Sequence, residues 1–232
     1  MKTIALIVAG GKSKRFGGEV PKQYLEISGK PLLTGTISKF EEARMIDRIV
    51  VVVPEEYLLF TSEQVVDPYN FRKVIKIVIG GETRRESVYK GLESLPISTN
   101  YVAIHDGARL LVSPNDIDRV VEIAKNEKAA ILAEKVTDTV KRAKDNYILT
   151  TLEREQLFLA QTPQVFQYDL IIEAHRKVNE KNNHCIYTDD ASLIEARGFK
   201  VMIVESTSPN IKVTSKSDLL LAKVLMDGCN NG

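Results

Sequence analysis

The regular alternation of apolar, β-branched runs with segments of helical periodicity constrains the fold of this chain more than any other feature. Strands are predicted at residues 3–9, 48–53, 74–79, 101–105, 129–133 and 200–204. Helices are predicted at residues 32–42, 84–95, 115–126, 169–179, 189–196 and 216–226. Several strands are apolar on both faces, which is typical of parallel strands covered by helices above and below. We therefore predict an α/β fold with a doubly wound, mostly parallel twisted sheet, built by residues 1–232 as one domain.

The first predicted strand leads directly into a loop rich in glycine and positive charge. The loop and the segment after it contain four glycines and four cations: Gly10, Gly11, Gly17, Gly18, Lys12, Lys14, Arg15 and Lys22. Glycines let backbone N–H groups approach an anion closely, and the cations add charge that a neutral ligand would not need. We predict a phosphate-bearing ligand here, because ligands of such sheets bind at the carboxyl ends of the strands.

Two common nucleotide motifs do not fit this loop. A Walker A motif needs a glycine five residues before Gly11, where the chain has Leu6. The G-x-G-x-x-G pattern fails because Ser13 occupies the place of the second glycine. Kinase-like P-loop chemistry and dinucleotide binding therefore both lose support.

Paired glycines follow the third predicted strand. Gly80 and Gly81 precede a helix for which Thr83 is the expected N-cap, with Glu86 completing a capping box. A helix cap does not need the glycines. We therefore give equal weight to a second interpretation, in which a base or ribose approaches this backbone closely.

Charged residues follow the fourth predicted strand. Asp106 could coordinate Mg²⁺ or a ribose hydroxyl, and Arg109 offers forked donors to a phosphate. A surface Asp–Arg pair at a turn is the alternative. His105 is expected to pack or to bond to backbone rather than act as a base, because alternation along the strand turns it away from Asp106. Together, three loops can converge on one site.

Three other motifs have mainly structural interpretations. Thr188 is expected to cap a helix whose first turn carries two acids. Residues 210–214 form a short β-like segment with Lys212 as its cation, and residues 162–164 are expected to form a turn.

One charged segment breaks the strand–helix alternation. Residues 136–142 and 147–152 predict two β-like runs around a polar turn. Their charge density leaves no apolar face to bury, and a hairpin that lacks its own core usually projects and needs a partner. We therefore predict a projecting arm at residues 136–156 and a homodimer formed through it.

Composition argues against several partners. Lys and Arg number 32 and Asp and Glu 31, so the net charge of +1 gives no global basic field for nucleic acid. The longest apolar runs are far short of the ~20 residues of a membrane span. Two distant cysteines predict no disulfide framework and a cytoplasmic location, and the three histidines form no metal-ligand pattern.

Together these motifs resemble the 2-C-methyl-D-erythritol 4-phosphate cytidylyltransferase family of the non-mevalonate isoprenoid pathway, nearly end to end. The resemblance is carried by residues 9–11 with Arg15, 21–24, 80–82 with Arg84 and Ser87, 105–109, 138–142, 162–164, 188–192 and 210–214. It implies a Rossmann-like nucleotidyltransferase that uses CTP and Mg²⁺, transfers the cytidylyl group to the methylerythritol phosphate and releases pyrophosphate. The attacking phosphate is already anionic, so the lack of a Ser-His-Asp arrangement agrees with this chemistry.

The resemblance also implies roles for particular residues. Arg15 and Lys22 would be catalytic by stabilising the α-phosphate in the transition state. The implied nucleotide-binding residues are Ala9, Gly10, Gly11, Gly80, Gly81, Glu82, Ser87, Asp106, Gly107 and Lys212. The implied acceptor-binding residues are Asp106, Arg109, Thr139, Arg154, Thr162, Thr188 and Lys212. Thr139 and Arg154 would lie on an arm that reaches the neighbouring subunit, and Asp106 would lie near the metal.

Some positions depart from the family pattern, and other functions stay open. Leu110 replaces a usual proline, and Glu82 replaces a frequent Asp. These departures leave the contacts to the base and the ribose open, but they do not affect the expected reaction class. A ribitol 5-phosphate cytidylyltransferase is the nearest alternative, although residues 138–142 favour methylerythritol phosphate. A non-catalytic nucleotide-binding module is a second alternative, and the failed G-x-G-x-x-G disfavours a third, an NAD-dependent oxidoreductase.

Overall fold

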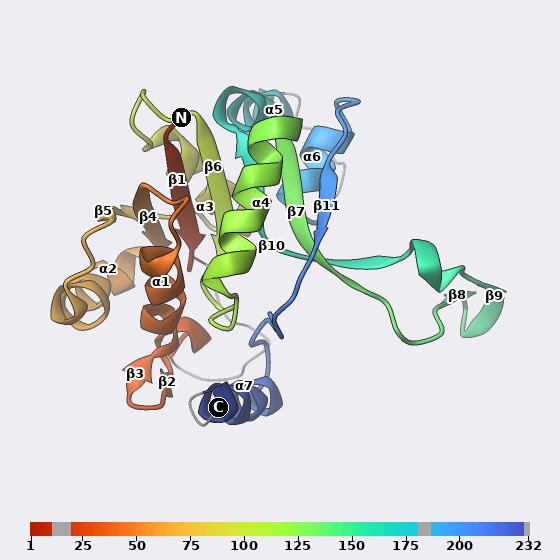
Figure 1. Cartoon of the computed structure of the whole chain (residues 1–232), viewed down its shortest axis with the longest axis horizontal. Coiled ribbons are helices and arrows are strands. Elements are labelled where there is room, and N and C mark those ends of the chain that lie inside the picture. The colour runs from red at the N-terminus through yellow and green to blue at the C-terminus, as the bar shows by residue number, and fades with distance from the viewer. Residues whose placement is uncertain (11–19, 181–186, 230–232) are drawn as a thin grey trace.

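A seven-stranded sheet forms the centre of the computed structural model, which describes residues 1–10, 20–180 and 187–229 (Figure 1). In spatial order the strands are β11 (Met202–Glu205), β7 (Ala129–Lys135), β10 (Phe158–Gln167), β6 (Tyr101–Asp106), β1 (Thr3–Val8), β4 (Arg48–Val53) and β5 (Val74–Ile79). Neighbouring strands are parallel, except that β10 runs antiparallel to both β6 and β7. The predicted α/β fold with a mostly parallel sheet is therefore confirmed.

Helices cover both faces of this sheet. They are α1 (Leu32–Glu42), α3 (Arg84–Glu93), α4 (Pro114–Glu127), α5 (Tyr168–Glu180) and α6 (Asp190–Glu195), whereas α7 (Lys216–Cys229) joins neither of the two cores on the sheet faces. Side chains alternate along β1, so Ala5 and Ile7 join one core with α1 and α4, whereas Ile4 and Leu6 join a second core with α3, α5 and α6. Both sides of β1 are fully buried, which is why its sequence is apolar throughout. Helix α7 packs on a smaller third core that includes Leu110.

Short elements connect these layers. They are η1 (Lys22–Tyr24), β2 (Glu26–Ile27), β3 (Lys30–Pro31), η2 (Glu55–Tyr57), α2 (Leu58–Phe60), η3 (Thr61–Val66), η4 (Asp67–Tyr69) and η5 (Arg154–Gln156). Tyr24 is buried and stacks on Tyr57, with ring centroids 4.2 Å apart, so η1 packs against the helical turns that follow β4. This packing fixes η1 beside the sheet.

The structure corrects three local predictions. All six predicted strands and six predicted helices form, with ends shifted by a few residues. Residues 162–164 are not a turn but lie within β10, where the register shifts between Ala160 and Gln164. Residues 210–214 form no strand. The N-cap of α6 is Asp189, whose carboxylate accepts from Ser192 N at 3.0 Å, and not Thr188.

The predicted hairpin projects from the body of the molecule as a separate two-stranded sheet (Figure 1). It consists of β8 (Lys141–Lys144) and β9 (Tyr147–Thr151), joined by Asp145 and Asn146 with φ values of 50° and 66°. Positive φ at both central residues is the geometry of the tight hairpin turn that matches strand twist. The expectation that charge leaves the arm no apolar surface to bury is wrong, because Tyr147, Ile148 and Leu149 are 79%, 65% and 54% exposed.

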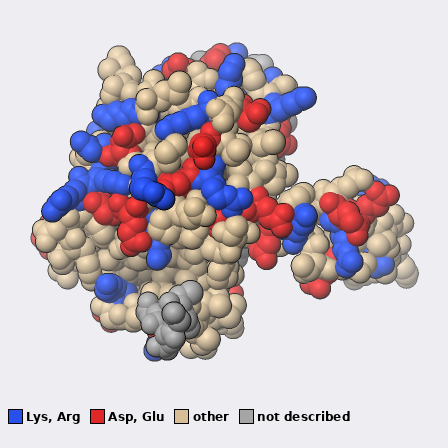
Figure 2. Space-filling model, in the orientation of Figure 1, with Lys and Arg blue, Asp and Glu red and all other residues tan. Residues whose placement is uncertain are grey.

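Charges of both signs are intermixed over the visible face of the body and along the arm (Figure 2). Within the described ranges, the helices are too short or too polar for any of them to cross a membrane.

Candidate active site

The loops predicted to converge do meet at the carboxyl edge of the sheet. Ala9 N donates to Val52 O at 2.7 Å, and Gly80 N donates to Val53 O at 2.8 Å. On the other side, Gly107 N donates to Val8 O at 2.9 Å. The segments that follow β1, β4, β5 and β6 therefore lie side by side at this edge.

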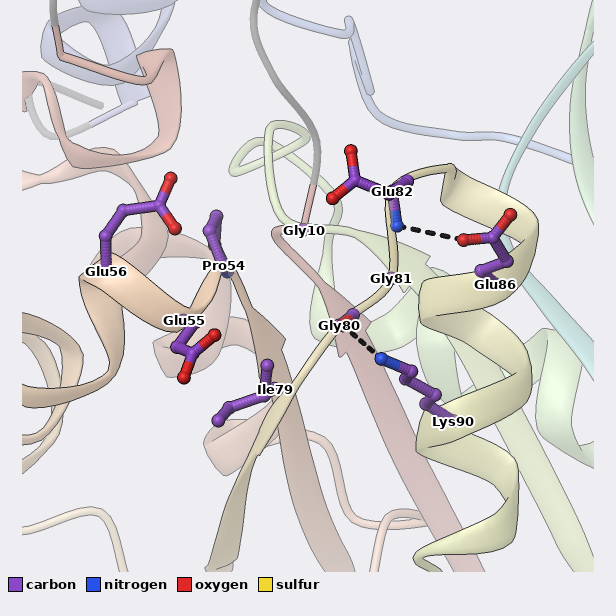
Figure 3. Close-up of a pocket in the computed structure, with 10 residues that line it drawn as sticks. All are labelled: Gly10, Pro54, Glu55, Glu56, Ile79, Gly80, Gly81, Glu82, Glu86 and Lys90. Atoms are coloured by element: carbon purple, nitrogen blue, oxygen red, sulfur yellow. Dashed lines mark hydrogen bonds between the residues drawn. The ribbon is translucent and has the colours of Figure 1, made fainter.

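A cavity of about 380 Å³ lies between the loops after β1, β4 and β5 (Figure 3). It is lined by Gly10, Pro54, Glu55, Glu56, Ile79, Gly80, Gly81, Glu82, Glu86 and Lys90. Figure 3 shows Glu55 and Glu56 on one side and the backbone of Gly80 and Gly81 on the other. The lining carries four carboxylates and one ammonium group, so this cavity suits an uncharged, hydrogen-bonding group better than a triphosphate.

The glycines are required by close packing on the first turn of α3. A Cβ atom on Gly10 would lie 2.8 Å from Ser87 Oγ, and one on Gly80 would lie 2.7 Å from the same atom. Ser87 is fully buried, and its hydroxyl accepts from Gly81 N at 3.0 Å and donates to Thr83 O at 2.9 Å. Ser87 thus holds the glycine backbone against the helix and shapes the cavity.

Capping fixes the same turn. Thr83 Oγ1 accepts from Glu86 N at 3.1 Å, which confirms Thr83 as the N-cap of α3. The Glu86 carboxylate accepts from Glu82 N at 2.9 Å, one residue earlier than in a standard capping box. Lys90 Nζ donates to Gly80 O at 2.9 Å. The capping interpretation of this segment is therefore confirmed, and the approach of a base or ribose to the glycine backbone stays a prediction.

Lys22 lies at the start of η1, which is tied to the end of β1. Gln23 Nε2 donates to Ala9 O at 3.0 Å, and Gln23 and Tyr24 are both buried. This contact brings the cationic residue Lys22 to the edge where β1 ends. Arg15 and Gly11 lie outside the described residues.

Asp106 at the end of β6 is the centre of a charged cluster. Its Oδ1 accepts from Arg84 Nε at 2.9 Å and its Oδ2 accepts from Lys212 Nζ at 2.6 Å, while Arg109 Nε lies 3.9 Å from Oδ2. Burial alone would raise the pKa of Asp106, but the Arg84 and Lys212 cations hold it well below its usual range. The carboxylate is therefore ionised at neutral pH.

Polar bonds hold this cluster against β10. Thr162 Oγ1 accepts from Asp106 N at 3.1 Å, and Asn210 Nδ2 donates to Thr162 O at 2.7 Å. Arg109 Nη1 donates to Asn210 O at 2.6 Å. The structure thus brings together Asp106, Arg109, Thr162 and Lys212, four residues that the family resemblance placed in one site.

His105 is part of the scaffold. It is fully buried, with Nε2 3.0 Å from Arg109 O and Nδ1 3.0 Å from Thr162 Oγ1. Burial lowers its pKa to about 3, so the ring is neutral and donates from Nε2 to the carbonyl. The prediction that His105 bonds to backbone is confirmed.

Other predicted site residues lie elsewhere. Arg154 belongs to η5 at the base of the arm, where Nη1 donates to Thr137 O at 2.8 Å, and Thr139 precedes β8 on the same arm. Thr188 is exposed before α6.

Arg84 is a site residue that the sequence analysis named in a motif but gave no role. The signal for such a role was a second arginine at the same glycine-rich turn.

The residues of the site fit a metal ion that takes most of its ligands from bound phosphates and water. No group of three or more His, Cys, Asp or Glu side chains suited to a metal occurs in the described part of the chain. The candidate ligand Asp106 already accepts from a cation at each oxygen. Mg²⁺ commonly binds through one or two carboxylates together with phosphates and water, and a lone aspartate is compatible with that mode.

Fold and site together define an α/β nucleotidyltransferase. The family profile of 2-C-methyl-D-erythritol 4-phosphate cytidylyltransferase matches residues 3–228, and the chain belongs to this family. A protein of that name from Pelotomaculum thermopropionicum is 43% identical over 229 residues, covering 97% of this chain and 94% of the relative. One from Alkaliphilus oremlandii is 40% identical over 226 residues, covering 97% and 95%.

Solved structures of the same kind match the fold. The crystal structure of 4-diphosphocytidyl-2C-methyl-D-erythritol synthase from Anaerococcus prevotii aligns with a TM-score of 0.86 at 28% identity, covering 97% of this chain and 96% of that one. The Francisella tularensis 2-C-methyl-D-erythritol 4-phosphate cytidylyltransferase aligns at 0.80 and 33% identity, covering 97% and 100%.

Proposed function

We propose how the residues of this site carry out the reaction of the family. In this reaction the chain transfers the cytidylyl group from CTP to 2-C-methyl-D-erythritol 4-phosphate, giving 4-diphosphocytidyl-2-C-methyl-D-erythritol and pyrophosphate. The observation that carries the assignment of roles is the placement of a glycine-lined cavity beside a cation cluster at one edge of the sheet.

The opposite charges of the two parts of the site, the glutamate-lined cavity and the cations beside it, orient the nucleotide. Four glutamates around the glycine-lined cavity disfavour a triphosphate there, so the cytosine and ribose occupy it, against the backbone of Gly10, Gly80 and Gly81. The triphosphate then extends toward Lys22 at η1, with Arg15 acting from the loop after β1. Ala9 and Gly107 contribute backbone at the same edge, Ser87 fixes the shape of the cavity, and Gly11 is kept as a nucleotide-binding residue from the family resemblance.

The chemical step needs no general base. An anionic oxygen of the acceptor phosphate attacks the α-phosphorus in line, the bond to the bridging oxygen of the β-phosphate breaks, and pyrophosphate leaves with that electron pair. Repulsion between two anions is the main obstacle, and fixed cations relieve it. Arg15 and Lys22 stabilise the charge on the α-phosphoryl group, while Arg109, Lys212 and Thr162 hold the acceptor. His105 is neutral and bonded to the scaffold, in agreement with a mechanism that uses no histidine base.

Mg²⁺ supplies further neutralisation of the phosphates when it is bound, and Asp106 is the residue that would hold it. Lys212 and Arg84 occupy both oxygens of Asp106 in the free protein. Because Lys212 is also a proposed ligand of the phosphates, its ammonium group can leave Asp106 for a phosphate oxygen when the substrates bind. We also propose a cytoplasmic location, which two distant cysteines support.

The arm at residues 136–156 completes the site of a neighbouring subunit in our proposal. Its exposed Tyr147, Ile148 and Leu149 would be buried in a homodimer, which gives the projecting hairpin the partner it needs. Thr139 and Arg154 would then reach the acceptor phosphate of the other subunit. Thr188, exposed before α6, is retained as a weaker acceptor-site candidate.

Pyrophosphate release across a panel of substrates tests the function. We expect release with CTP and 2-C-methyl-D-erythritol 4-phosphate, and much less with UTP, ATP or GTP, or with ribitol 5-phosphate as acceptor. Preferential release with ribitol 5-phosphate would assign the sister activity. Tight CTP binding without release from any pair would indicate a non-catalytic nucleotide-binding protein.

Replacing Arg154 by alanine is expected to raise the KM for the acceptor about tenfold or more and to change the KM for CTP less than twofold. Arg154 is half-exposed on the arm, and a hydrogen bond to a charged group contributes roughly 1.5–3 kcal/mol. Steady-state kinetics with each substrate varied in turn measures the effect. Lys144→Ala removes another exposed arm cation and is the matched control. If only the KM for CTP rises, the arm does not bind the acceptor.

Light scattering is expected to give twice the chain mass at assay concentration. Replacing Ile148 by aspartate places a charge among the exposed apolar residues of the arm and should shift the protein toward the monomer and lower activity with it. Ile97→Asp is the matched control, because Ile97 is fully exposed on the body, and it should stay dimeric. A monomeric wild-type protein with full activity would refute shared sites.

A further inference from the structure

A line of alternating charges runs from the proposed site into the interior of the protein. Lys212 Nζ contacts Asp106 at 2.6 Å, Asp106 contacts Arg84 Nε at 2.9 Å, and Arg84 Nη1 contacts Asp190 Oδ2 at 2.8 Å. The line ends where His175 Nε2 lies 3.2 Å from Asp190 Oδ1. These residues come from five separate segments, so the line exists only in the folded chain.

The inner end of this line is rigid. Asp190 and His175 are 2% and 0% exposed. Gln164 Oε1 accepts from the backbone N–H groups of Asp190 and Ala191 at 3.1 and 3.0 Å, and Gln164 Nε2 donates to Asp189 Oδ2 at 2.7 Å. The first turn of α6 is therefore fastened to β10, which fixes the backbone of Asp190, while its carboxylate is held between Arg84 Nη1 and His175 Nε2.

Helix capping does not explain Asp190. The preceding residue, Asp189, already caps α6 through Ser192 N, so a second buried acid is unnecessary for the helix. Burial alone would raise the pKa of Asp190, but the Arg84 cation lowers it and keeps the carboxylate ionised. A buried charge is costly unless it is paired, and here the pairing residue is Arg84.

We propose that Asp190 is a positioning residue that acts through Arg84 on Asp106. Arg84 uses two different nitrogens for the two carboxylates, so Asp190 fixes the plane of the guanidinium group and thereby the orientation of Asp106. Oδ1 of Asp106 is held on the side of Arg84, and Oδ2 is left facing Lys212 and the ligand. This inference rests on the proposed role of Asp106 in the site.

The charge balance supports the same role. Three cations, Arg84, Arg109 and Lys212, surround Asp106. Asp190 neutralises the inner one, so the cluster keeps one net positive charge, on the side where Lys212 and Arg109 lie. Without Asp190 the guanidinium of Arg84 would be drawn fully to Asp106 and would compete with Lys212 for its oxygens.

Asp190→Asn tests this role in the full-length enzyme, because the side chain keeps its shape and loses its charge. We expect kcat/KM for CTP to fall about tenfold to hundredfold, the range of one misplaced charged hydrogen bond, in protein that circular dichroism shows to be folded at the assay temperature. Asp118→Asn is the matched control: Asp118 accepts from Met45 N at 2.7 Å, away from the site, and this variant should keep kcat/KM within twofold.

A double-mutant cycle separates positioning from general stability. Arg84→Gln and Asp190→Asn should together lose little more than the larger single loss, because they act on one contact, whereas Arg84→Gln and Asp118→Asn should add. The inference would be overturned if the losses of Arg84→Gln and Asp190→Asn add in free energy. It would also be overturned if folded Asp190→Asn changes kcat/KM for CTP less than twofold. If Asp190→Asn does not fold, Arg84→Gln decides alone: a change below twofold overturns it.

Asp106→Asn, measured in parallel, distinguishes this inference from the proposal on which it rests. If Asp106→Asn keeps full kcat/KM, the role of Asp106 in the site is wrong. If Asp106→Asn loses activity and folded Asp190→Asn does not, the positioning role alone is wrong.

Discussion

Replacing Lys22 by alanine lowers kcat by roughly 10²–10³, the usual effect of removing one group aimed at the charge that develops in a transition state. Lys22 begins η1, and η1 is fixed to the end of β1 by the bond from Gln23 to Ala9 O. The cation is therefore held where the triphosphate is expected to lie. Arg15→Ala is expected to have an effect of the same size, because both cations act on the α-phosphoryl group.

Steady-state pyrophosphate release measures this prediction. The protein should stay folded, because Lys22 contributes to no buried core and its neighbours Gln23 and Tyr24 keep η1 in place. Lys30→Ala is the matched control, since this nearby exposed lysine lies over the Tyr69 ring, 5.5 Å from its centroid, and has no proposed role. Near-normal kcat for Lys22→Ala would contradict the assignment.

Asp106→Asn is expected to affect both activity and stability. Removing one partner of a buried ion pair leaves uncompensated charge, here on Lys212, since Arg84 keeps its pair with Asp190, and this typically costs roughly 3 kcal/mol or somewhat more. Partial exposure of Lys212 places the expected loss at the low end of that range. We also expect kcat/KM for CTP to fall at least tenfold, because the ribose, the acceptor and Mg²⁺ are all proposed to lie beside this carboxylate.

The stability loss should depend on pH in one direction. The pKa of Asp106 is lowered in the folded protein, so its contribution is fully present above the unfolded pKa of about 4 and is lost as pH falls below it. The difference in unfolding free energy between wild type and Asp106→Asn should therefore shrink between pH 5 and pH 3. Urea unfolding at several pH values measures it, and a difference that grows as pH falls would contradict the ion-pair account.

Much of the fold follows from local sequence. Buried parallel strands must be apolar on both faces, so runs such as Arg48–Val53 are recognisable without any knowledge of their neighbours. Strand β10 was missed because Thr162, Pro163 and Gln164 resemble a turn. A proline is tolerated in a strand at an irregularity, and the register shift after Ala160 provides one. That irregularity depends on pairing with β7, which no local pattern reports.

Some residues of the candidate site could likewise be predicted from local sequence, and others could not. Glycines and cations directly after strands predicted the loops at Gly10, Gly80 and Asp106, because the carboxyl ends of parallel strands meet at one edge. The bond between Arg84 and Asp190 joins residues 106 positions apart, and it depends on how α6 packs against β10. The sequence signal for Asp190 was that two consecutive acids stand at a helix start that needs only one cap.

A crystal structure of the enzyme with CTP and Mg²⁺ tests the central claim most directly. The account predicts the cytosine against the backbone of Gly80 and Gly81, and the triphosphate within hydrogen-bonding distance of Lys22 and Arg15. A triphosphate bound away from these two cations, or a base outside the glycine-lined cavity, would contradict it.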